Sequence, residues 1–138
     1  MTYYAVIDTN VIVSSMLKRD SFPGKVLDYV LHGTIVPLLN DDILSEYIDV
    51  LSRNEFGFSI SDVDELQSFL QVNGIFLNRT KVEDIFPDPD DAVFYEVALT
   101  ARNVPDAYLV TGSIKHFPSR SFVVTPREMV EIIEKISL

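Results

Sequence analysis

The sequence contains no cysteine and only two histidines, His32 and His116. The lack of cysteine excludes disulfide frameworks, zinc ribbons, thiol nucleophiles and iron–sulfur ligation, and two histidines disfavour a histidine-rich metal site. Long apolar runs are also missing, since no stretch approaches the roughly 20 residues that span a bilayer. The short apolar run near the N-terminus has no basic residue before it and ends at Asp8, unlike a signal peptide. We expect a soluble, cytoplasmic protein with no membrane segment.

Basic residues are scarce. The chain has 11 Lys and Arg against 21 Asp and Glu, which gives a formal net charge of −10. This balance argues against a protein that holds nucleic acid by a broad basic face. A nuclease is still compatible with it, because bound divalent cations can reverse the local field at an acidic site.

The length of 138 residues predicts one domain over residues 1–138, since domains commonly have about 100–200 residues. A domain of this size buries roughly two thirds of the surface that its unfolded chain exposes. It can therefore form a core without disulfides or a structural metal.

Strand-like and helix-like patterns alternate along the chain. The predicted strands are Tyr3–Ile7, Thr34–Leu38, Gly74–Leu77, Ala107–Val110 and Phe122–Val124. The first and fourth are nearly continuous apolar runs, as expected for strands buried on both faces. The predicted helices, with apolar residues at helical spacing, are Val11–Leu17, Pro23–Leu31, Asp41–Arg53, Ser61–Val72, Pro89–Ala101 and Pro126–Ile136. This order predicts an α/β fold, a three-layer α/β/α sandwich around a mainly parallel sheet of about four to five strands.

Asp8 directly follows the first predicted strand. In parallel sheets, ligands bind beyond the carboxyl ends of the strands, so a carboxylate at this position points into the expected crevice. A turn residue or a helix N-cap explains the same position.

Asp88-Pro89-Asp90-Asp91 opens the helix before the fourth predicted strand. Capping alone explains the motif, with Asp88 as N-cap, Pro89 in the first turn and two acids at the positive end of the helix. The same cap places Asp88 and Asp91 one turn apart, so both carboxylates can face one side. Mg²⁺ prefers oxygen ligands and keeps several waters, so a few carboxylates suffice to bind it.

Two further features lie at the same predicted edge. Glu46 lies beside the apolar stripe of the helix 41–53, but periodicity does not choose between Glu46, Asp42 and Asp49, and a solvated helix face explains any one of them. Thr111-Gly112-Ser113 follows the fourth strand and can bind a phosphate or a water, or form a turn in which Gly112 supplies a positive φ. Together these residues predict a two-metal phosphodiesterase site.

In this order, these residues resemble the PIN-domain family of metal-dependent ribonucleases over nearly the whole chain. The motifs that carry the resemblance are Val6–Val11, Leu44–Arg53, Asp88–Asp91 and Tyr108–Gly112. The likeness is greatest to the branch of toxin components of bacterial toxin–antitoxin systems. Thr-Gly-Asn-x-Lys-His-Phe-Pro is frequent in that branch, and this chain has Thr-Gly-Ser-Ile-Lys-His-Phe-Pro at 111–118.

The resemblance implies an acidic cluster that binds Mg²⁺ or Mn²⁺ and hydrolysis of single-stranded RNA. The metal ligands carried over by position are Asp8, Glu46 and Asp91. The residues expected around them are Asp88 as an outer acid, Thr9 and Asn10 on the floor of the site, and Thr111, which would orient a water or a phosphate. As a toxin, the protein would bind a small antitoxin protein and form a homodimer. Phe22, Phe56 and Phe58 would either make such contacts or close the core under loops.

The chain departs from the family pattern at Ser113, where many PIN nucleases carry a fourth acidic residue. One cation can be held by the three predicted ligands, whereas a second would lose a ligand unless Asp88 or Asp90 replaces it. Lys115 would stabilise charge on the leaving side, or is simply a solvent-facing turn residue. His116 would act as an acid or base, or pack beside Phe117. We expect weak, strongly metal-dependent RNA binding with a shallow salt dependence.

Three alternatives stay open. A phosphatase with Asp8 as nucleophile, as in the haloacid dehalogenase superfamily, would need an acid where this chain has Asn10. A receiver domain would need a phosphoacceptor Asp after the third strand, where Leu77-Asn78-Arg79 offers none. The strongest competitor is a PIN-like binding module that has lost catalysis, which Ser113 favours. A competent site should bind Mn²⁺, whereas a degenerate one should not.

Overall fold

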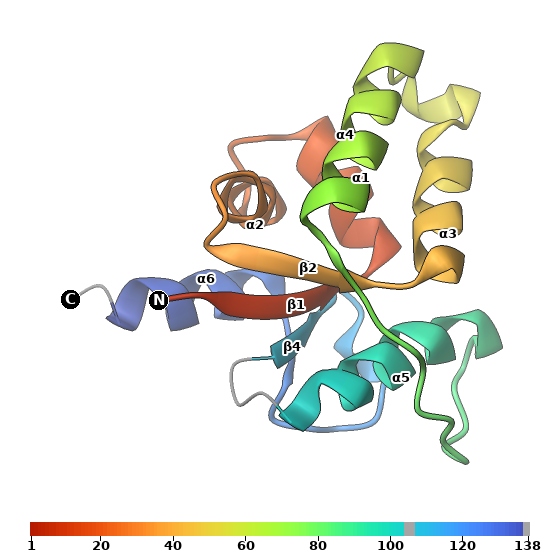
Figure 1. Ribbon diagram of the computed structural model, residues 1–138, viewed down its shortest axis with the longest axis vertical. Coiled ribbons are helices and arrows are strands. Elements are labelled where there is room, and N and C mark those ends of the chain that lie inside the picture. The colour runs from red at the N-terminus through yellow and green to blue at the C-terminus, as the bar shows by residue number, and fades with distance from the viewer. Residues whose placement is uncertain (104–106, 137–138) are drawn as a thin grey trace.

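A five-stranded parallel sheet organises the residues that the computed structural model describes, 1–103 and 107–136 (Figure 1). The strand order is β3-β2-β1-β4-β5. The strands are β1 (Tyr3–Ile7), β2 (Ile35–Leu39), β3 (Ile75–Phe76), β4 (Ala107–Val110) and β5 (Val123–Val124). In the central pair, Tyr4 lies opposite Ala107 and Ile7 opposite Val110. Because β1 and β4 end together, the residues that follow them meet at one edge of the sheet.

Helices cover both faces of the sheet. They are α1 (Thr9–Leu17), α2 (Phe22–Leu31), α3 (Asp41–Leu51), α4 (Ile60–Asn73), α5 (Ala92–Thr100) and α6 (Pro126–Ile136). Figure 1 shows α1, α2 and α4 above the sheet and α5 below it. On its face α5 packs against β1, β2 and β4, and α6 packs against α2. The predicted α/β/α sandwich is confirmed.

The core explains why β1 reads as a continuous apolar run. Ala5 and Val6 are fully buried, because helices remove both faces of this central strand from water. By contrast, both residues of the edge strand β3 are exposed, and the predicted strand 74–77 is shortened to them. Within the described ranges, no helix is long and apolar enough to cross a bilayer.

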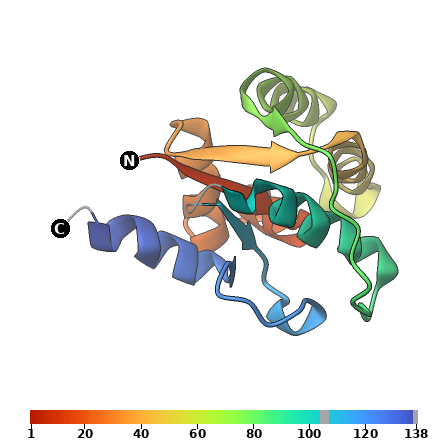
Figure 2. The same cartoon turned by 60° about the horizontal axis from the view of Figure 1, so that its bottom comes forward.

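The chain between β3 and α5 forms an irregular segment, residues 77–88, with no helix or strand. Figures 1 and 2 show it descending from β3 past α5 and then turning back into that helix. It ends at Asp88, which precedes a short 3-10 helix, η2 (Pro89–Asp91). The predicted helix 89–101 is therefore divided into η2, α5 and a second 3-10 turn, η3 (Ala101–Asn103).

Gly112 does not have the positive φ that the turn interpretation required, so that expectation is wrong. Among the described residues, Gly33 and Gly57 are the glycines with positive φ. A Cβ added at Gly112 would meet no atom within 4 Å. The turn after β4 is instead held by the side chain of Thr111, which accepts a hydrogen bond from the Ser113 N–H at 3.0 Å.

Candidate active site

Asp8 occupies the junction between β1 and α1 and is only 5% exposed. Its N–H donates to the Val110 carbonyl at 2.9 Å, which ties it to the end of β4. It stands at the N-cap position of α1, but its side chain makes no capping hydrogen bond. Instead, Asp8 Oδ2 accepts from the Thr111 hydroxyl at 2.8 Å. The turn after β4 therefore holds this buried carboxylate through the Thr111 hydroxyl.

The turn after β4 brings Thr111 and Ser113 to the end of β1, whereas Lys115 and Asn10 are exposed. Thr111 is fully buried, and its N–H donates to the Val124 carbonyl at 2.9 Å. Ser113 stands before a 3-10 helix, η4 (Ile114–His116), without capping it through its side chain. Lys115 is exposed on η4, and Asn10 is exposed in the first turn of α1. The structure shows no contact of the Lys115 or Asn10 side chain with the acidic cluster.

Helix α3 delivers Glu46 to the same place. The buried Tyr47 hydroxyl donates to the Ile7 carbonyl, which fixes α3 against the end of β1. One residue earlier, Glu46 Oε2 accepts from the Thr9 hydroxyl. Thr9 is itself buried at the start of α1, next to Asp8.

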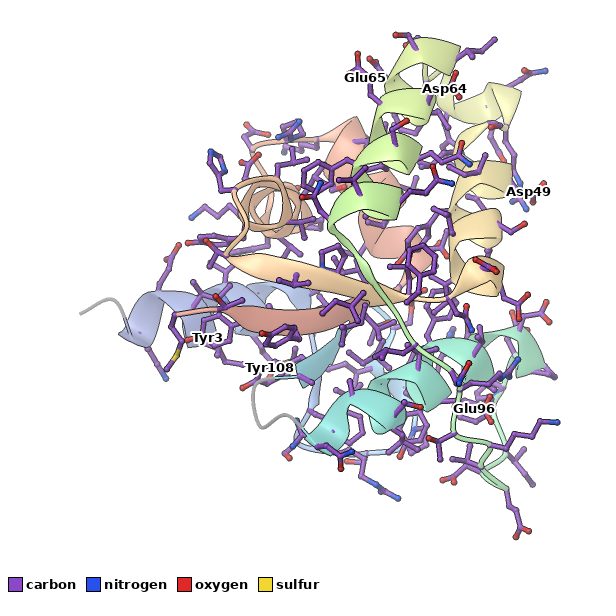
Figure 3. The ribbon with its side chains drawn as sticks, viewed as in Figure 1. Tyr3, Asp49, Asp64, Glu65, Glu96 and Tyr108 are labelled. Carbon is purple, nitrogen blue, oxygen red and sulfur yellow. The ribbon has the colours of Figure 1, made fainter. Side chains whose placement is uncertain are left out.

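The other two acids of α3 have different surroundings. Asp49 lies on the outer side of the helix, where its carboxylate is 3.5 Å from Arg53 (Figure 3). Asp42 lies one turn before Glu46 and lines a hollow beside it. Of the three acids that periodicity left open, Glu46 is the one bonded to Thr9, the residue that follows Asp8.

The Asp88–Asp91 motif contributes one cap and one inward carboxylate. Asp88 is exposed, and its side chain caps η2 by accepting from the Asp90 N–H at 3.0 Å. Asp91 has a side chain that is only 19% exposed, and its Oδ2 lies 3.8 Å from His116 Nδ1. The structure thus separates the roles that the sequence left overlapping, with Asp88 as cap and Asp91 facing the interior.

The carboxylates lie within electrostatic reach of one another. Burial raises the pKa of Asp8 above its ordinary value, and the hydrogen bond from Thr111 opposes part of this rise. Burial, followed by the negative charges of Asp8 and Asp88, raises the pKa of Asp91 to about 6. Burial is also the largest cause of the raised pKa of Glu46, and the charge of Asp8 adds to it. Raised pKa values in a group of facing carboxylates are typical of functional sites.

This donor set fits a hard divalent cation in its chemistry. It offers carboxylate oxygens from three separate elements, and a cation would offset both the burial of these charges and their mutual repulsion, which raise the pKa values of Glu46 and Asp91. The present side-chain positions do not form a closed site. In the part of the chain that the structure describes, no group of three or more His, Cys, Asp or Glu side chains could hold a metal ion as it stands. Metal binding would require movement of these side chains.

A hollow of about 230 Å³ opens beside the acidic cluster. Its lining residues are Asp42, Glu46, Arg79, Pro89, Asp90 and Val93. A larger hollow of about 410 Å³ lies elsewhere, between α1, α2 and α4, and its walls include Met16, Leu27 and Phe58. We assign the chemistry to the smaller hollow, because Glu46 and Asp90 line it.

Sequence reasoning missed three residues that support this region. Tyr47 reads as an ordinary member of an apolar stripe, and nothing in its pattern signals its bond to β1. Glu96 gives a detectable signal, because it is a charged residue inside the apolar run Phe94–Ala98 of α5. Its partner Arg79 lies 17 residues earlier, in the irregular segment, where no periodicity relates the two.

Comparison with known proteins relates the chain to a family. Residues 4–115 match a family model described as the PIN domain, a range that includes the predicted metal ligands Asp8, Glu46 and Asp91. An uncharacterized protein of Methanocaldococcus jannaschii is 27% identical over 142 aligned positions, which cover 94% of this chain and 91% of that protein. No solved structure matches the chain.

Proposed function

This chain belongs to the PIN domain family, whose members are generally nucleases, and from that premise we propose that it is a metal-dependent endoribonuclease that cleaves single-stranded RNA. The observation that carries the proposal is the surroundings of Asp8. Its carboxylate is buried at the sheet edge, accepts a hydrogen bond from the Thr111 hydroxyl across the sheet, and lies near Glu46 and Asp91.

The proposed chemistry is hydrolysis of a phosphodiester bond. Mg²⁺ or Mn²⁺ held by Asp8, Glu46 and Asp91 would lower the pKa of the attacking water and offset the negative charge of the phosphate. Two hydroxyls of this chain orient the ligands, since Thr111 holds Asp8 and Thr9 holds Glu46. Buried hydroxyls of this kind keep carboxylates in place and raise metal affinity.

The residues around the ligands complete the proposed site. Asp88 contributes negative charge from the rim while it caps η2. Asn10 stands exposed in the first turn of α1, where it would contact a bound RNA strand. Lys115 and His116 lie on η4, and His116 is 3.8 Å from Asp91, so this turn would contact the phosphate or the leaving oxygen.

A catalytically degenerate PIN-like binding module is the second candidate, and Ser113 favours it. Ser113 stands where many PIN nucleases have a fourth acid, so a second cation would lose a ligand. Binding of Mn²⁺ separates the two candidates. An intact site binds it through the three proposed ligands, whereas a degenerate module does not.

The test is cleavage of a labelled single-stranded RNA by the purified protein with Mg²⁺ or Mn²⁺. We expect cleavage that EDTA stops and that Asp8→Asn and Glu46→Gln each abolish. Asp49→Asn is the matched control, because it removes one carboxylate from α3 on the outer side of that helix. A contaminating nuclease would survive Asp8→Asn.

Each result of this assay decides something. Intact RNA together with bound Mn²⁺ would show that Ser113 limits catalysis, and Ser113→Asp should then restore cleavage. Intact RNA without bound Mn²⁺ would refute the nuclease and leave the binding module.

We further propose that the protein acts in the cytoplasm as the toxin component of a toxin–antitoxin pair. The motif at 111–118 supports this role, as does the apolar hollow between α1, α2 and α4. Asp62 and Glu65 border that hollow together with Arg19, which is paired with Asp28, so its occupant would be a basic, amphipathic segment of a small antitoxin. Phe58 lines the hollow and stacks on Phe56 at 6.0 Å. Phe22 is 42% exposed on α2 and lies outside the lining of the hollow.

Growth of cells that express the chain from an inducible promoter tests the toxin role. We expect growth arrest that Asp8→Asn relieves. Normal growth with a protein that cleaves RNA in vitro would contradict the toxin role but not the nuclease. The homodimer implied by the family branch is tested separately, by light scattering of the purified protein.

A further inference from the structure

The irregular segment 77–88 is fixed to α5 by a buried carboxylate. Glu96 is only 3% exposed, and Figure 3 shows it where this segment passes the helix. Its Oε1 accepts from Arg79 Nε at 2.6 Å and also contacts Nη2 of the same guanidinium. Its Oε2 accepts from the Val82 N–H at 2.9 Å. A buried carboxylate with this many donors holds its partner in one orientation.

The guanidinium of Arg79 has a second side that Glu96 does not use. Nη1 has no acceptor among the described residues, and 37% of the side chain stays exposed. Arg79 also lines the hollow that contains Glu46 and Asp90, beside the acidic cluster. The guanidinium is thus anchored on its Nε and Nη2 side and lies at the edge of the proposed active site.

The position of this cation is informative because the protein is so acidic. The formal net charge is −10, and three carboxylates share the hollow with Arg79. An RNA strand that reaches the site needs positive charge on its path. Lys115 is exposed on η4, and Arg79 supplies positive charge beside Glu46. Arginine suits this task, since its planar fork pairs with phosphate oxygens.

We propose that Arg79 binds a backbone phosphate next to the scissile one, and that Glu96 is the positioning residue that orients its guanidinium. This inference rests on the proposed nuclease function. A purely structural pair would stabilise the 77–88 segment and would make no contact with RNA.

The test replaces both charges at once. Arg79→Gln with Glu96→Gln leaves the net charge unchanged and keeps an amide oxygen for the Val82 N–H, so the buried position is not left with an unpaired charge. The matched control is Arg127→Gln with Glu131→Gln, an exposed pair on α6 with the same change of charges. The probe is a fluorescein-labelled oligouridylate about ten nucleotides long, followed by anisotropy with Ca²⁺ in place of Mg²⁺.

We expect the Arg79–Glu96 variant to bind the probe about tenfold more weakly than the control variant does. The slope of log affinity against log salt should fall by about 0.7, the contribution of one phosphate contact on a single strand. Cleavage with Mn²⁺ should show a raised KM with kcat little changed. Thermal melting in parallel reports the fold, and a structural role alone would not move the salt slope.

Unchanged affinity and salt slope in a folded Arg79–Glu96 variant would overturn the inference while the nuclease stands. RNA that the unaltered protein neither binds nor cleaves would overturn both. Arg79→Lys tests the inference if the double variant does not fold. This substitution keeps the positive charge but removes the planar guanidinium that pairs with two phosphate oxygens. It should keep the salt slope and bind the probe two- to threefold more weakly, and full affinity in Arg79→Lys would count against the forked contact.

Discussion

Asp91→Asn should make the metal-free protein more stable. The pKa of Asp91 rises from its ordinary value of 3.8 to about 6, mainly through burial and the charges of Asp8 and Asp88. At full value this rise corresponds to about 3 kcal/mol. Solvent reaches part of the carboxylate and screens roughly half of that, and Asn also gives up about 0.5 kcal/mol of favourable charge at a helix start. We therefore expect a net gain of about 1 kcal/mol at pH 8.

The sign of the pH dependence follows from the direction of the shift. Between about pH 4 and pH 6 the folded protein binds more protons at Asp91 than the unfolded chain does. The free energy of unfolding therefore falls as the pH rises through this window and stays low above it. The gain from Asp91→Asn should be full at pH 8 and nearly absent at pH 4.

Urea unfolding in EDTA at the two pH values measures this gain. At pH 8 the variant should also melt about 3 °C higher than the unaltered protein. Asp49→Asn, at an exposed pair, should change neither quantity. Added Mn²⁺ should reverse the order, because it stabilises only the protein that retains its ligands. A variant no more stable than the unaltered protein at pH 8 in EDTA would refute the idea that burial and the neighbouring carboxylates disfavour the charge of Asp91.

Three further substitutions test the supports of the site. Thr111→Val removes the donor to the Asp8 carboxylate and should lower the free energy of unfolding in urea by about 1.5–3 kcal/mol. RNA cleavage should be lost as well. Unchanged cleavage would contradict the proposal that Thr111 orients Asp8. Tyr47→Phe removes one buried hydrogen bond to the end of β1 and should lower the free energy of unfolding by about 1 kcal/mol. A change smaller than about 0.3 kcal/mol, the scatter of such measurements, would count against a stabilising role for this bond. Glu96→Ala leaves the Arg79 guanidinium without its buried partner and should lower the free energy of unfolding by about 3–5 kcal/mol. Glu96→Gln should lower it less, and equal losses in the two variants would show that the charge of Glu96 is unimportant.

The fold was predictable because periodicity reports burial. The continuous apolar runs at 3–7 and 107–110 mark strands covered on both faces, and their shared carboxyl edge follows from parallel pairing. The 3-10 turn at 89–91 was not predicted, because it depends on the Asp88 side chain and carbonyl bonding to the next N–H groups rather than on apolar spacing.

The sequence predicted which strand and helix ends form the candidate site, but not which side chains contact one another there. The predicted strand and helix ends placed Asp8 and the 88–91 motif at one edge of the sheet. For residues within a helix, however, a helical-wheel projection gives only the angle of each side chain about the helix axis. It could not distinguish Glu46 from its acidic neighbours, because the difference is the hydroxyl of Thr9, 37 residues earlier. The roles of these residues in metal binding and catalysis stay predictions until cleavage and metal binding are measured.

The bond between Thr111 and Asp8 spans 103 residues, and this separation sets an order in time. As a ribosome synthesises the chain from its N-terminus, β1 emerges early and can pair with β2, while its other edge waits for β4. Until the turn after β4 has left the exit tunnel, the Asp8 carboxylate has neither its hydroxyl donor nor the strand that encloses it. The growing polypeptide therefore carries no assembled candidate site, and the proposed RNA cleavage would begin only after the codons for β4 and the turn that follows it have been translated.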